Sequence, residues 1–140
     1  MVFAARTFSV LGITLIGCSI AGAECPVDTV IVQGQVEHAA RDAKVRVQLV
    51  YAKDLPGETG EASVEEGKFT IPIEFLTLSK RPWLRNLPAK CDRKPRTVNL
   101  TLVEDGQEFD PLLLDFARDF KLVDASAYAL RSELVLNRKR

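Results

Sequence analysis

Histidine and cysteine, the side chains that many catalytic and metal sites use, are scarce in this chain of 140 residues. His38 is the only histidine, and there are three cysteines. A zinc site built from these residue types therefore has too few ligands. A Ser-His-Asp triad would have to use His38, but no nucleophile-elbow motif surrounds the available hydroxyl residues. We expect His38 to be a solvated turn residue, and we predict no cofactor.

The sequence also lacks a hydrophobic run long enough to cross a membrane. Its main apolar stretch, residues 7–20, contains Gly and Ser and is too short for a hydrocarbon core of about 30 Å. This stretch follows Arg6 and precedes residues 21–23 (Ala-Gly-Ala), small residues of the kind that signal peptidase reads. The order predicts a signal peptide over residues 1–23, a secreted extracellular chain that begins at Glu24, and no transmembrane segment.

A second interpretation of the same stretch stays open. Residues 15–18 (Leu-Ile-Gly-Cys) also fit the bacterial lipobox, in which Cys18 is lipidated and heads the mature chain. A bacterial protein would then be lipid-anchored through Cys18. Lipoproteins usually keep a flexible tether, however, and here the folded domain would begin only a few residues after the lipid.

Excess charge of either sign is missing as well. The chain has 19 basic and 19 acidic side chains, and removal of Arg6 with the signal leaves 18 against 19. No global field favours a nucleic acid or a membrane, so any charge-driven binding must be local. Residues 24–140 number 117, enough for one domain that buries roughly two-thirds of its unfolded surface. We expect a single domain there, with a disordered basic tail over about 137–140.

Two cysteines remain once Cys18 has been removed or lipidated. Cys25 and Cys91 pair by parity, because a secreted chain meets an oxidising compartment. The bond would close a loop of some sixty-odd residues, for which the chain-entropy model gives roughly 4 kcal/mol. The sequence therefore predicts one disulfide, with two unpaired buried thiols as the alternative.

Apolar and polar residues alternate along most of residues 24–140, which is the pattern of half-buried strands. The expected strands are residues 30–36, 45–51, 62–64, 69–75, 98–102, 109–116 and 128–136. Gly34 interrupts the first of them, and Pro111 marks a break in the sixth. Pro72 cannot donate to a ladder, so its strand should lie at a sheet edge or carry a bulge. Seven short strands are typical of an all-β, two-sheet sandwich.

Turn residues separate several of these strands. We expect turns at residues 55–60, 65–67 and 104–106, the last two short enough for hairpins. No twelve-residue window sustains helical spacing, although short helical turns fit residues 75–79 and 114–122.

Four stretches carry a resemblance to a known family. Residues 33–36 (Gln-Gly-Gln-Val), the valine-rich 43–49 and residues 66–72 (Glu-Gly-Lys-Phe-Thr-Ile-Pro) resemble the opening half of transthyretin-like and carboxypeptidase-regulatory-like domains. Residues 91–94 (Cys-Asp-Arg-Lys) are similar to a stretch of secreted transthyretin-like proteins. The resemblance covers about half of the chain after the signal and implies a seven-stranded, immunoglobulin-like sandwich. It implies the fold without the activity of the family's hydroxyisourate hydrolases, which use several histidines, an arginine and a C-terminal Tyr-Arg-Gly-Ser, because this chain has one histidine and ends in Asn-Arg-Lys-Arg.

Residues 79–96 form a long basic loop and are the most informative stretch. Long loops on rigid scaffolds often carry binding residues, and Trp and Arg dominate interface hot spots. The candidate partner-binding residues are Lys80, Arg81, Trp83, Arg85, Lys90, Arg93, Lys94 and Arg96, with Asp92 as the one acid among them. The structural alternative is a loop whose Trp83 caps the core and which Cys91 ties to the N-terminus.

Two further features allow a chemical interpretation. The acids of the downstream stretch are Glu104, Asp105, Glu108, Asp110, Asp115 and Asp119. Their spacing matches no calcium loop, and we expect them on a solvated face. Asn99-Leu100-Thr101 is an N-glycosylation sequon whose Asn99 points away from the apolar face, so it is a possible modification site in a eukaryote.

Together these features favour a small secreted, non-enzymatic binding module that engages an extracellular protein or an anionic surface. A role in host interaction would fit. The alternatives are a carboxylate-based extracellular hydrolase and a structural coat or wall component. Facing acids in a deep groove would favour the hydrolase, and a flat surface that exposes Trp83 would favour the binding module.

Overall fold

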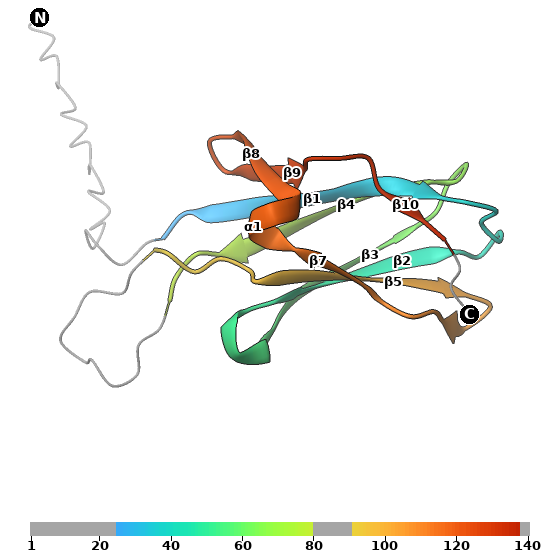
Figure 1. Ribbon diagram of the computed structural model, residues 1–140, viewed down its shortest axis with the longest axis horizontal. Helices are drawn as coiled ribbons and strands as arrows, with labels where there is room; N and C mark the ends of the chain where they lie inside the picture. The colour runs from blue at the N-terminus through green and yellow to red at the C-terminus, as the bar shows by residue number, and fades with distance from the viewer. Residues whose placement is uncertain (1–24, 80–90, 138–140) are drawn as a thin grey trace, which may run out of the picture.

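The computed structural model describes residues 25–79 and 91–137, which form two stacked β-sheets (Figure 1). The first sheet contains β1 (Val27–Val36), β4 (Lys68–Leu76), β8 (Phe120–Asp124), β9 (Ala127–Leu130) and β10 (Val135–Leu136). The second contains β2 (Lys44–Val50), β3 (Pro56–Ser63), β5 (Thr97–Glu104), β6 (Gln107–Glu108) and β7 (Leu112–Asp115). Two short helical segments, η1 (Ala52–Asp54) and α1 (Phe116–Asp119), complete the elements. The expected all-β sandwich is confirmed.

Strand alternation builds the core between the two sheets. In β4 the side chains of Phe69, Ile71, Ile73 and Phe75 are buried while their neighbours are exposed. The facing strands β2 and β5 repeat the pattern, and Val45, Val47, Leu49, Val98 and Leu100 are at most 1% exposed. Burial of each such side chain stabilises the fold by about 1.5–3 kcal/mol relative to exposure.

The edges of the two sheets are brought together on both sides of the sandwich. β4 pairs only with β1, and β3 pairs only with β2, with a tight turn at residues 64–67 between them. On the other side α1 carries the chain from β7 of the second sheet to β8 of the first (Figure 1). Pro72 therefore lies on an edge strand, as its missing N–H requires.

An aromatic cluster closes the sandwich beneath α1. The ring of Phe116 stacks on Phe120 at a centroid distance of 5.5 Å and lies 4.9 Å from Tyr128. Phe75 meets Phe116 edge-to-face at 6.3 Å. Phe75 thus continues the inward alternation of β4, and the helical turn expected at residues 75–79 does not form. Thr77 instead is buried, and its hydroxyl donates to the carbonyl of Pro26 at 3.0 Å.

The structure has ten strands rather than the seven expected. The expected strand at residues 128–136 is divided into β9 and β10 by residues 131–134. The expected strand at 109–116 is shortened to β7, and Pro111 separates it from β6. Residues 114–122 were expected to hold a helical turn, and they do contain α1, but β8 begins directly after it.

The expected turn at residues 55–60 is wrong. β3 begins at Pro56, and the chain reverses earlier, in η1. Gly57 lies in β3, where a Cβ would lie 2.2 Å from Cε2 of the Tyr51 ring. The glycine at this position therefore reflects close packing rather than a turn. The hairpin at residues 104–106 is confirmed, because Glu104 pairs with Gln107 across Asp105 and Gly106, both with positive φ.

Candidate functional site

The disulfide predicted from parity is present. Cys25 and Cys91 are bonded, with their Cα atoms 5.3 Å apart. The bond joins the start of β1 to the downstream end of the basic segment, which we define as residues 79–96. One end of that segment is thereby covalently fixed to the sandwich.

Hydrogen bonds join the two ends of the basic segment and connect its downstream end to Thr77, just after β4, and to Val50 of β2. The Ser79 hydroxyl donates to the Asp92 carboxylate at 2.7 Å, across the base of the segment. The backbone N–H of Arg93 donates to the carbonyl of Thr77 at 2.8 Å, and that of Arg96 donates to Val50 at 2.7 Å. The described ends of the segment are therefore held by main-chain as well as side-chain contacts.

Arg93 has an internal role that the sequence does not reveal. Its guanidinium carbon lies 3.5 Å from the centroid of the Tyr51 ring, and Nη1 lies 3.6 Å from a Glu58 carboxylate oxygen. The Tyr51 hydroxyl donates to the other oxygen of Glu58. Burial, followed by the hydrogen bond to Glu58, raises the pKa of Tyr51 well above its usual range. A stacked cation and an anion thus surround one buried phenol.

Lys94 and Arg96 differ from Arg93 because both side chains are exposed, while Pro95 between them is buried. Neither forms an ion pair with a residue of the described ranges. The remaining candidates, Lys80, Arg81, Trp83, Arg85 and Lys90, lie outside the described residues, as do the signal segment 1–23 and residues 138–140 of the expected tail.

Asn99 lies on the outer face of the second sheet. It sits in β5 opposite Gln48 of β2 on one side and Leu113 of β7 on the other. Its side-chain Oδ1 is buried and has no hydrogen-bond partner among the described residues. The outward orientation expected from alternation agrees with this placement. Glycosylation of the sequon stays a prediction.

Several acids of the downstream stretch have structural contacts. Asp115 caps α1 by accepting a hydrogen bond from the Arg118 N–H at 2.9 Å. Asp119 accepts from the N–H of Asp115 and pairs with Arg118, and the Arg118 hydrogen bond holds the pKa of Asp119 below its usual range. Glu108 pairs with Arg46 at 2.6 Å. These acids are thereby engaged in holding local structure.

His38 and Glu104 lie at the turn after β1 and at the end of β5. His38 is exposed in the turn after β1, with φ of 52°, as expected for a turn residue. Glu104 is 6% exposed at the end of β5, and its carboxylate lies 3.5 Å from the Ala40 N–H. No group of three or more metal-ligating side chains occurs within residues 25–79 and 91–137.

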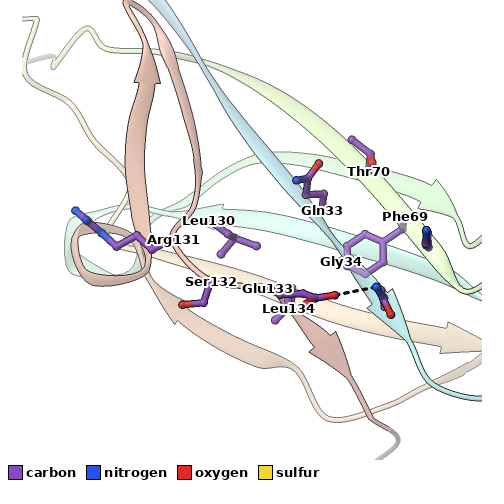
Figure 2. A pocket seen from close by; sticks show the side chains of 11 residues that line it. Gln33, Gly34, Phe69, Thr70, Leu130, Arg131, Ser132, Glu133 and Leu134 are labelled. Carbon is purple, nitrogen blue, oxygen red and sulfur yellow. Dashed lines mark hydrogen bonds between the residues drawn. The ribbon is translucent and has the colours of Figure 1, made fainter.

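A cavity of about 490 Å³ lies over a bulge that the sequence did not suggest (Figure 2). β1 pairs with β9 at Ile31–Ala129 and with β10 at Gln35–Val135, so β1 advances four residues while the facing chain advances six. The extra residues push the segment 131–134 out of the sheet. Such bulges redirect side chains and are frequent beside functional sites.

Gly34 allows the bulged segment to approach β1 closely. A Cβ at Gly34 would lie 2.7 Å from the carbonyl oxygen of Leu134. The Gln35 N–H donates to that same oxygen at 2.9 Å, and the Gln35 side-chain amide donates to Glu133 at 2.8 Å, the dashed line in Figure 2. The sequence marked this place only as an interruption of the expected strand at Gly34.

The chemistry of the cavity is polar and mixed in charge. Its lining includes the amides of Gln33 and Gln35, the Thr70 hydroxyl, Lys68 and Arg131, with Glu133 as its only carboxylate. Two further cavities, between β3 and β4 and beside β10, are lined by one carboxylate each, Glu65 and Asp110. None of these three cavities brings together the pair of facing acids that glycoside hydrolysis requires.

Comparison with family models, with curated proteins and with solved structures finds no match to this chain. The resemblance to transthyretin-like domains therefore stays a prediction from the sequence. Within the described ranges, no helix has both the length and the apolar character needed to cross a bilayer.

Proposed function

We propose that the chain is a small secreted, non-enzymatic binding module whose basic segment engages an anionic partner outside the cell. The partner is either an acidic face of an extracellular protein or a polyanionic surface. The observation that carries the proposal is the way both ends of the segment are held, by the Cys25–Cys91 bond and by the contacts of Ser79, Asp92 and Arg93. Binding residues are commonly presented from loops whose ends a rigid scaffold fixes.

Local charge supports this assignment. Because basic and acidic residues balance over the whole chain, attraction of an anion depends on where cations are concentrated. The segment has seven cationic residues and one acid, Asp92, whose carboxylate accepts a hydrogen bond from Ser79. Lys94 and Arg96 lie at its described end with exposed side chains.

The disulfide supports the extracellular part of the proposal. Structural disulfides persist in oxidising compartments and are rare in the cytosol. The bond here fits a chain exported by the signal segment 1–23 and cleaved before Glu24.

Retention on immobilised heparin, a polyanion used here as the probe, tests the proposal. The double variant Lys94→Glu with Arg96→Glu should elute at markedly lower salt, because exposed ionic contacts are screened and lost on charge reversal. Reversal of Arg81, Arg85 and Lys90 should act in the same direction, while the thermal midpoint stays nearly unchanged. The matched control reverses Arg41 and Lys53, which are exposed elsewhere and form no described ion pair.

Two outcomes would contradict the proposal. One is equal loss of retention in the Arg41 and Lys53 control, which would mean that binding follows net charge rather than the segment. The other is unchanged retention after reversal of the segment's cations. Trp83→Ala adds a further test, since a presented tryptophan should lose binding with the fold intact, whereas a core tryptophan should cost about 3–5 kcal/mol of stability.

A further inference from the structure

The free edge of β8 is one of the sheet edges that carry exposed apolar side chains. β8 is the terminal strand of the first sheet and pairs only with β9. Leu122 is 56% exposed and Val123 is 50% exposed, at adjacent positions of this strand. β8 and β9 form a hairpin at the side of the sandwich (Figure 1). An edge strand with two exposed apolar residues is a template for association with another chain.

The edges on the opposite side of the sandwich carry features that prevent such association. β4 contains Pro72, and β3 contains Glu61, which forms ion pairs with Lys44 and Arg46 of the neighbouring strand. Proline and charge are the usual means of protecting an exposed edge. β8 has a bulge at Val123, because its register against β9 shifts between Leu122 and Asp124. The bulge prevents a long hydrogen-bond ladder between β8 and another chain, so side chains would make most of the contact.

The charges that flank the two apolar residues are complementary to a second copy of the strand. Lys121 precedes them and Asp124 follows them, and neither forms an ion pair with another residue of the described chain. A two-fold axis between Leu122 and Val123 would run two copies antiparallel. Lys121 of each copy would then face Asp124 of the other, because a two-fold contact repeats every pair.

We propose that the β8 edge is the contact through which two copies of this chain form a symmetric dimer. Leu122 and Val123 supply the apolar centre, and two Lys121–Asp124 pairs fix the antiparallel register. The contact is short, so the dimer belongs to the small-interface class and dissociates on dilution. This inference does not depend on the proposed function of the basic segment, which lies on other residues.

Sedimentation equilibrium of the secreted chain over a range of concentrations tests the dimer. The wild type should associate reversibly to twice its monomer mass. Lys121→Asp alone and Asp124→Lys alone should each raise the dimer dissociation constant by at least about tenfold, because each places like charges opposite each other twice. An equimolar mixture of the two variants should associate again, since the Asp introduced at 121 in one copy then faces the Lys introduced at 124 in the other.

Two neutral substitutions give the matched control. Leu122→Asn should weaken the dimer, whereas Leu113→Asn, at a position 59% exposed on β7 of the other sheet, should leave it unchanged. Circular dichroism should give the same fold for all variants, because each site is exposed. A wild type that stays monomeric at the highest soluble concentration would overturn the proposal, as would self-association of both charge variants at the wild-type level.

Discussion

The guanidinium of Arg93 stacks on the ring of Tyr51, with 3.5 Å between the guanidinium carbon and the ring centroid. The two residues come from separate parts of the chain, one at the end of β2 and the other in the basic segment. Glu58 of β3 joins them through an ion pair to Arg93 and a hydrogen bond from Tyr51. One cation of the basic segment therefore anchors it to the second sheet.

Replacement of Arg93 should destabilise the domain more than replacement of its neighbour. Arg93→Ala should lower the free energy of unfolding by about 1–2 kcal/mol, because it removes the stacking and leaves Glu58 without its cation. Arg93→Lys should be more stable than Arg93→Ala but less stable than the wild type, since an ammonium lacks the planar face that stacks on Tyr51. Lys94→Ala, at an exposed position, should change the free energy of unfolding by no more than about 0.5 kcal/mol. Urea titration measures all three, and equal effects at 93 and 94 would contradict the anchoring role.

The Tyr51 environment predicts a loss of stability in alkali. The folded state raises the pKa of Tyr51, so the proton is bound more tightly in the folded than in the unfolded chain. Its contribution is complete below the ordinary tyrosine pKa of about 10 and is lost as the pH rises above it. Unfolding midpoints in urea between about pH 8 and about pH 11 should therefore fall less steeply for Tyr51→Phe than for the wild type. Parallel curves would show that Tyr51 does not titrate differently in the two states.

Loss of the disulfide should weaken the fold without abolishing its strand pattern. Replacing Cys25 and Cys91 together with Ser should cost about 2–5 kcal/mol, because the unfolded chain regains the entropy that the cross-link removes. Guanidinium unfolding of the variant and of the oxidised wild type gives the difference. A non-reducing peptide map that finds two alkylatable thiols in the wild type would contradict the bond.

The close approach of Leu134 to β1 predicts that a side chain at position 34 lowers the stability of the fold. Gly34→Ala should destabilise by about 1–3 kcal/mol, because its Cβ would press on the Leu134 carbonyl oxygen and displace the bulged segment 131–134. Gln33→Ala, an exposed neighbour in the same strand, is the control and should change little. Thermal unfolding measures both variants. A Gly34→Ala midpoint equal to that of the wild type would mean that the segment moves away freely.

The N-terminus of the exported protein tests the secretion signal. The small residues at 21–23 predict that chain recovered from the culture medium begins at Glu24. Intact-mass measurement with N-terminal sequencing determines the start. A lipidated Cys18 at the N-terminus would instead establish the membrane-anchored interpretation.

The local pattern of residues determined which side chains face the core and which strand lies at an edge. Period-two alternation in β2, β4 and β5 is a property of neighbouring residues, so it is visible without any tertiary contact. Pro72 indicated an edge because the missing N–H is a property of one residue. The Cys25–Cys91 bond followed from parity, since one pairing remains after Cys18 is set aside.

Only the tertiary structure decided how segments distant in sequence meet. Alternation continued through residues 128–136, but the two extra residues opposite β1 divide them into β9 and β10, and register between strands is not written in either strand alone. Gly57 looked like part of a turn until the Tyr51 ring was found against it. From the sequence, Arg93 was expected to be a cation available to a partner. Its contacts with Tyr51 and Glu58 arise only when β2 and β3 pack, and no local pattern encodes that approach.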